Sequence, residues 1–137
     1  MRRTLQRRIP GKVASLGAAA VLAATPVAAQ APELAMLGTL TKGEWSLRHR
    51  ADGSQQRICL RDGREFIQIR HREPGCSRFV VRDQANEVVV QYTCRGNGYG
   101  RTSIRREGSG LVQIQSQGII DGAPFSINAE ARHVGSC

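Results

Sequence analysis

The sequence predicts an α+β domain built mostly from antiparallel strands, a curved or barrel-like meander sheet with one short helix and two disulfides. Three observations favour this fold class. Short stretches of alternating apolar and polar residues recur along the chain. Turns that contain glycine separate these stretches roughly every 8–12 residues. Four cysteines, an even number, follow an apolar N-terminal segment of the kind that directs export, so they are expected to pair in an oxidising compartment.

Residues 1–29 have the three parts of a cleavable signal peptide. Residues 2–12 carry basic side chains, and residues 13–24 are apolar but too short a run to span a bilayer comfortably. The small residues at 27–29 favour cleavage after Ala29. We therefore expect a periplasmic protein without a stable membrane anchor, and the pattern leaves open whether export uses the general or the twin-arginine route.

Removing the signal changes how the charge is interpreted. The whole chain has 20 basic and 11 acidic residues, a net charge of +9. Five basic residues and no acidic ones lie in residues 1–29, which leaves 15 against 11, or +4, on the remainder. The remaining arginines are scattered and form no stripe with interleaved aromatics, so the sequence predicts no nucleic-acid partner. Solvated outward faces of strands are the favoured interpretation, and a basic patch for an anionic envelope polymer stays open.

Residues 30–42 are predicted to form an N-terminal arm, either partly ordered or a short helix, in front of a single domain at 43–137. The domain begins with a strand from Gly43 to His49 and a second strand at 56–60. Asp62 and Glu65 then stand at the spacing of a helix N-cap and its partner, which predicts a short helix over residues 62–71. A strand over the same segment is the competing interpretation.

The rest of the domain is predicted to be a series of hairpins. A glycine-rich turn at 96–100 and the clean alternation of residues 125–132 are the strongest local signals. The expected strands are 77–83, 87–95, 99–107, 111–117 and the last one at 125–132.

The hairpin around Ala85 predicts how the cysteines pair. It places residue 80 opposite 90 and Cys76 opposite Cys94, which leaves Cys59 to pair with the C-terminal Cys137. The same register puts two arginines on the face of apolar residues, and a bulge near Gly75 would relieve that conflict.

The spacing of the possible ligands and nucleophiles predicts neither a metal site nor a catalytic residue nor a cofactor. The cysteines are 17, 18 and 43 residues apart, far from the close pairs of zinc and thiol-redox motifs. The three histidines, His49, His71 and His133, have no partner at motif spacing, and no serine lies in a nucleophile elbow. The loop at 96–100 precedes a strand rather than a helix, which favours a turn over a phosphate site.

Two aromatic residues are candidate ligand or surface contacts. Tyr99 lies in the glycine-rich segment and is the aromatic residue most expected to be exposed. Trp45 is the second candidate, although its place in an alternating strand favours a role in the core.

Residues 43–137 resemble a family of small exported proteobacterial proteins that is classed as a domain of unknown function. The resemblance lies in the Gly43-Glu44-Trp45 start, in the first three cysteines with Tyr92-Thr93-Cys94, in Gly118, and in the ending at residues 131–137. It implies a periplasmic, disulfide-bonded, β-rich domain and supplies no catalytic residues.

These observations together predict a non-catalytic binding or envelope-associated module. Its expected partner is a small apolar ligand or another envelope protein. Two alternatives stay open. One is a small hydrolase acting on envelope components through a histidine beside a carboxylate or serine, and the other is a periplasmic inhibitor of another enzyme.

Overall fold

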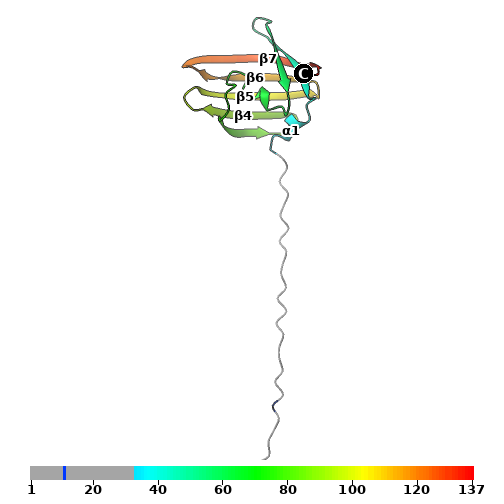
Figure 1. The fold of residues 1–137 in the computed structure, drawn as a ribbon, viewed down its shortest axis with the longest axis vertical. Coiled ribbons are helices and arrows are strands. Elements are labelled where there is room, and N and C mark those ends of the chain that lie inside the picture. Colours follow the sequence, from blue (N-terminus) through cyan, green and yellow to red (C-terminus); the bar gives the residue numbers. More distant parts are fainter. Residues whose placement is uncertain (1–10, 12–32) are drawn as a thin grey trace, which may run out of the picture.

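The computed structural model describes Gly11 and residues 33–137, so the predicted signal peptide at 1–29 lies outside the described residues. Two short helices and seven strands follow one another in the described part (Figure 1). They are α1 (Ala35–Gly38), β1 (Gly43–His49), β2 (Gln55–Leu60), the 3₁₀ turn η1 (Arg64–Phe66), β3 (Ser77–Asp83), β4 (Glu87–Cys94), β5 (Gly98–Gly108), β6 (Leu111–Ile120) and β7 (Ala123–Gly135). No helix among them is long and apolar enough to cross a membrane.

All seven strands form one antiparallel sheet in the order β2-β1-β7-β6-β5-β4-β3. Strands β3 to β7 are consecutive hairpins, which confirms the predicted meander. The last strand, β7, then pairs with β1, so the first strand of the domain joins the sheet through the last. The sheet is open, with β2 and β3 as its edges, rather than a closed barrel.

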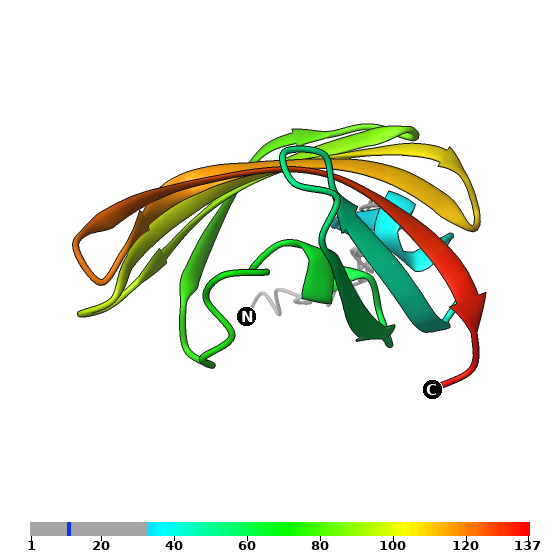
Figure 2. The ribbon, with the colours of Figure 1, turned by 90° about the horizontal axis from the view of Figure 1, so that it is seen from above.

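The alternation along the strands divides the sheet into two faces. One face, here called the inner face, carries buried apolar side chains such as Leu47, Val90 and Ile114. Both short helices lie on this side of the sheet (Figure 2). Trp45 of β1 meets the ring of Phe66 edge to face at a centroid distance of 5.3 Å. The core therefore sits between the inner face and the segments that contain α1 and η1.

The N-terminal arm is ordered from residue 33 onward and packs against the domain. The backbone N–H of Leu34 donates to the Asp83 carboxylate over 2.8 Å, which ties α1 to the end of β3. At Gly63, with φ +87°, an added Cβ would lie 2.7 Å from the Cβ of Leu37. Glycine at 63 thus allows α1 and the η1 segment to approach closely.

The helix predicted over residues 62–71 is reduced to the single turn η1. The predicted N-cap pair does not form: Gly63 is the N-cap residue of η1 and has no side-chain cap, while Asp62 accepts from the backbone N–H of Arg64 and Glu65 accepts from that of Arg61. Four consecutive residues, Phe66 to Ile69, are buried. A helix can bury only one stripe of its surface, so a continuous buried run favours an irregular chain packed against the sheet.

Both predicted disulfides are present. Cys59 bonds to Cys137, with Cα atoms 5.8 Å apart, and Cys76 bonds to Cys94, with Cα atoms 4.3 Å apart. Two disulfides favour an oxidising compartment. The first bridge joins β2 to the end of the chain across the start of β1, since Glu44 pairs with both Cys59 and Gly135.

The bulge in the β3–β4 hairpin lies between Val80 and Arg82, not near Gly75 as predicted. Val80 faces Val90 as the hairpin register requires. Arg78 stays on the inner side opposite Tyr92, where its guanidinium donates to the Gln68 side-chain oxygen over 2.8 and 2.5 Å. The acceptor on the segment that follows η1 thus resolves the conflict for Arg78, and the bulge resolves it for Arg82, which pairs with Val89 instead of Val88.

Candidate functional site

The cysteines are structural in the described chain, in which none is free. The Glu73 carboxylate and the sulfur atoms of Cys76 and Cys94 lie within 4.8 Å of one another, a spacing that could suit a metal ion. Each sulfur is bonded to the other, however, and a disulfide sulfur is not the thiolate that metals bind. This cluster therefore holds β3 to β4 while the bond is intact.

His71 is fully buried, and both of its ring nitrogens have partners. Nδ1 lies 3.0 Å from the Tyr92 hydroxyl and Nε2 lies 3.2 Å from the backbone carbonyl of Asn97. Because a carbonyl only accepts, the neutral ring carries its proton on Nε2, and the Tyr92 hydroxyl donates to Nδ1. Burial raises the pKa of Tyr92, which keeps its hydroxyl protonated as that donor.

The histidines do not form the pair that a hydrolase would need. Among the described residues, no hydrogen bond joins a histidine ring to a carboxylate or to a serine hydroxyl, and His49 and His133 make no side-chain hydrogen bond. The geometry of His71 therefore favours a buried structural role, in which it ties the η1 segment to β4 and to the turn before β5.

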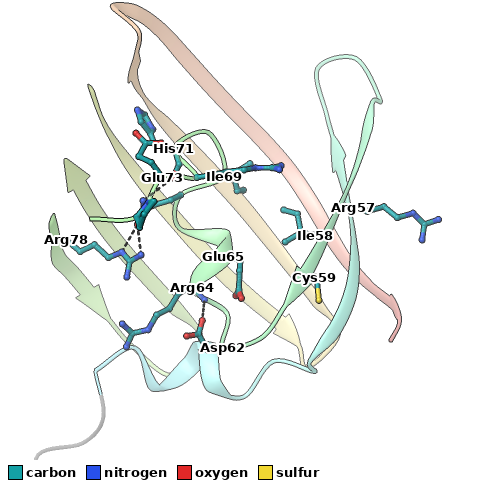
Figure 3. A pocket seen from close by; sticks show the side chains of 13 residues that line it. Arg57, Ile58, Cys59, Asp62, Arg64, Glu65, Ile69, His71, Glu73 and Arg78 are labelled. Atoms are coloured by element: carbon teal, nitrogen blue, oxygen red, sulfur yellow. Dashed lines mark hydrogen bonds between the residues drawn. The ribbon is translucent and has the colours of Figure 1, made fainter. Parts of the chain in front are cut away.

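A cleft of about 680 Å³ opens beside η1 and carries side chains of both charge signs (Figure 3). Many of these groups already bind within the protein: Arg78 donates to Gln68, and Asp62 accepts from the backbone of Arg64. Arg57 forms an ion pair with Glu44. The cleft is thus a surface of mixed charge in which several polar groups are already hydrogen-bonded and Arg57 is the lining residue in an ion pair of the described chain.

The two aromatic candidates have opposite environments. Trp45 exposes none of its surface, and its indole N–H donates to the Thr41 carbonyl over 2.8 Å. It belongs to the core and is not available for a surface contact. Tyr99 is 51% exposed on the other face of the sheet, here called the outer face, as expected for a surface contact.

Tyr99 borders a shallow hollow of about 420 Å³ on the outer face. Gln91, Arg101 and Gln117 also line it. A second hollow of about 370 Å³ adjoins the first, because Arg101 and Gln117 line both. Its other outer-face residues are neutral and polar: Ser103, Gln115, Ser126 and Asn128.

Register brings the central residues of the two hollows into one row. Gln91 of β4 pairs with Arg101 of β5, and Arg101 pairs with Gln117 of β6. Side chains directly opposite each other across an antiparallel pair lie with Cβ atoms about 5 Å apart. Arg101 thus stands between two amides, with the exposed ring of Tyr99 two residues away on the same strand. We call these four residues the Arg101 row.

The Arg101 row carries one unpaired positive charge. Five other arginines on or beside the outer face, but not the exposed Arg48 of β1, form ion pairs with glutamates within the described chain: Arg50 and Arg132 with Glu130, Arg57 with Glu44, Arg82 with Glu87, and Arg105 with Glu107. Arg101 is in none of these pairs, and both of its cross-strand neighbours are uncharged. Its guanidinium is therefore exposed and available to an external acceptor.

Comparison of the chain with protein-family models, curated proteins and solved structures finds no match.

Proposed function

We propose that this protein is a non-catalytic binding module of the cell envelope, exported to the periplasm, that binds a polar ligand on the outer face of its sheet. The observation that carries the proposal is the Arg101 row, which lies between two adjoining hollows on a face that neither helix covers. Its exposed aromatic ring, amides and guanidinium are the groups with which proteins orient polar ligands.

The packing of the inner face supports a polar ligand over the small apolar one expected from sequence. The apolar side chains of β4 and β5, such as Val88 and Ile104, are fully buried under α1 and the η1 segment. An apolar ligand on that face would have to displace these segments, whereas the outer face is open as it stands.

The two alternative functions, a hydrolase and an inhibitor of another enzyme, would each require a different structural feature. A hydrolase would use a histidine beside a carboxylate or serine in a cleft, but His71 is buried with both nitrogens bonded. His49 lines a hollow with Asp52 and Ser54, although no hydrogen bond joins its ring to either residue. An inhibitor of another enzyme would insert an exposed loop or edge strand, and β3 with its exposed Phe79 is the segment to test for that role.

Export and membership of the family of exported proteobacterial proteins are part of the same proposal. The intact mass of the protein recovered from the periplasm should correspond to a chain that starts after Ala29. A periplasmic protein that keeps Met1 would contradict the signal peptide.

Hydroxyl-radical footprinting with and without a soluble digest of cell-envelope material tests the binding role. Protection of Tyr99 in the wild type, and its loss in Arg101→Gln, is the expected result. Protection confined to exposed residues of the cleft beside η1, such as Pro74, or no protection at any site, would contradict it. Hydrolysis of an ester, amide or glycoside in the digest that His49→Ala or His71→Ala abolishes would support the hydrolase instead.

A further inference from the structure

We propose that the ligand of the Arg101 row is an acidic saccharide, that is, a sugar chain that carries a carboxylate. This inference rests on the proposed function and names the chemical class of its ligand. Three kinds of group in the row support it, namely the guanidinium, the two amides and the phenol ring, and each is suited to bind a different part of such a molecule.

The guanidinium of Arg101 calls for an anion with two oxygen atoms. An arginine side chain has N–H donors and no acceptor, and its planar fork matches a carboxylate in a bidentate pair. The structure offers Arg101 no carboxylate from the described chain, although it pairs five other arginines near this face. A ligand carboxylate would give Arg101 the kind of partner that these five arginines have within the protein.

The amides of Gln91 and Gln117 call for hydroxyl groups. Each amide offers both donors and an acceptor, as does a sugar hydroxyl, so one side chain can bind a neighbouring donor and acceptor pair. The two residues stand on either side of Arg101, and the strand spacing places them about 10 Å apart. A carboxylate flanked on both sides by hydroxyls therefore fits the row.

The ring of Tyr99 is suited to pack against an apolar surface at the edge of the same ligand. A phenol ring is an apolar body with a polar tip, and half of this one is exposed. A pyranose ring presents C–H groups on one face and hydroxyls at its rim. Free phosphate or a simple carboxylate would leave Tyr99 and the amides unused, and a neutral sugar would leave Arg101 unused.

Calorimetric titration of the mature, disulfide-bonded protein with tetragalacturonate, in roughly 150 mM salt to screen weak attraction, tests the inference. Maltotetraose serves as the neutral saccharide and acetate as the carboxylate alone. We expect saturable binding of tetragalacturonate only. Arg101→Gln should weaken it about 10- to 100-fold, since charge-assisted hydrogen bonds are the strong ones. Tyr99→Ala should weaken it about 3- to 10-fold.

Arg48→Gln is the matched control, because Arg48 is also exposed on the outer face, lies outside the ion pairs and is removed from the hollows that contain Arg101. It makes the same change of charge and should leave the affinity within about two-fold. Arg101→Lys keeps the positive charge but not the planar guanidinium, so its affinity for tetragalacturonate should lie between those of the wild type and Arg101→Gln. Thermal melting of each variant checks that the fold is kept.

Several results would overturn the inference. Equal weakening by Arg48→Gln would show attraction to net charge alone, and equal binding of maltotetraose would show a neutral site. Absence of tetragalacturonate binding, together with Tyr99 protection by envelope material, would reject the saccharide and leave the proposed binding role standing. Absence of both would reject the two proposals together.

Discussion

The Cys59–Cys137 disulfide permits a direct measurement of what a cross-link contributes to this small domain. Both cysteines are exposed, so replacing them with serine removes little packing. The second bridge is less suitable, because Cys94 is 2% exposed and belongs to the core. In a Cys59→Ser/Cys137→Ser variant, the change in free energy of unfolding should therefore come mainly from the lost cross-link.

The expected size follows from the length of the closed loop. Cys59 and Cys137 are separated by 78 residues. In the chain-entropy model, a loop of that length restricts the unfolded chain by about 4.5 kcal/mol. The Cys76–Cys94 loop, with a separation of 18, gives about 3.2 kcal/mol in the same model. Since small domains are stable by about 5–15 kcal/mol in all, loss of the longer loop should remove a large share of the stability.

Equilibrium unfolding in urea, followed by the fluorescence of Trp45, measures the loss. Trp45 is the only tryptophan and is fully buried, so its emission changes when the core opens. With a urea dependence of roughly 1.5 kcal/mol per molar, the midpoint should fall by about 2–3 M. Ser136→Ala, a neighbouring exposed change, is the control and should stay within about 0.5 kcal/mol of the wild type. A midpoint shift below about 0.5 M in the double variant would refute the loop-entropy argument.

Three further predictions concern β4 and β5. Gly100→Ala should destabilise the domain by about 1–3 kcal/mol, measured by urea unfolding, because its Cβ would lie 2.3 Å from the buried hydroxyl of Tyr92. Tyr92→Phe should cost about 1–3 kcal/mol by the same assay, since it leaves the Nδ1 atom of His71 buried without a partner. The hydrogen bond from Arg82 lowers the pKa of Glu87 in the folded protein. The ionised Glu87 carboxylate therefore stabilises the fold above the ordinary glutamate pKa, and this stabilisation is lost as the pH falls through the lowered pKa of the folded state. The difference in melting temperature between wild type and Glu87→Gln should therefore vanish in acid, and a difference that persists there would contradict the assignment.

Local pattern was enough to predict the strands and both disulfides. Alternation with a period of two marks a half-buried strand wherever it occurs, and a tight hairpin fixes which residues face each other. The pairing of β7 with β1 could not be predicted in this way, because their contact joins distant parts of the chain. Local pattern also gave the wrong structure for residues 62–71, where Gly63 rather than Asp62 is the N-cap residue of η1 and the four residues after Glu65 are all buried.

The candidate site was predicted only in part, for a related reason. Tyr99 stands out in the sequence because a large aromatic ring sits among glycines. Arg101 does not stand out among many arginines, and its distinguishing feature is the identity of its cross-strand neighbours. These neighbours, Gln91 and Gln117, depend on the register of two hairpins at once. The sequence predicts those hairpins, and the register of both together would have placed Gln91 and Gln117 opposite Arg101.

Strand β5 explains why the outer face can be changed without loss of the fold. Its inner residues hold the core, since Thr102 bonds to the Ile67 carbonyl and to the Ser116 hydroxyl, each over 2.7 Å. Its outer residues, Tyr99 and Arg101, point to solvent from the same rigid backbone. A site built on a strand that is anchored from behind is held in place before a ligand arrives, which lowers the entropy lost on binding. Substitutions at Arg101 should therefore change the affinity for the ligand while leaving the melting temperature unchanged. The role of the outer face in binding can then be measured without a change in the stability of the fold.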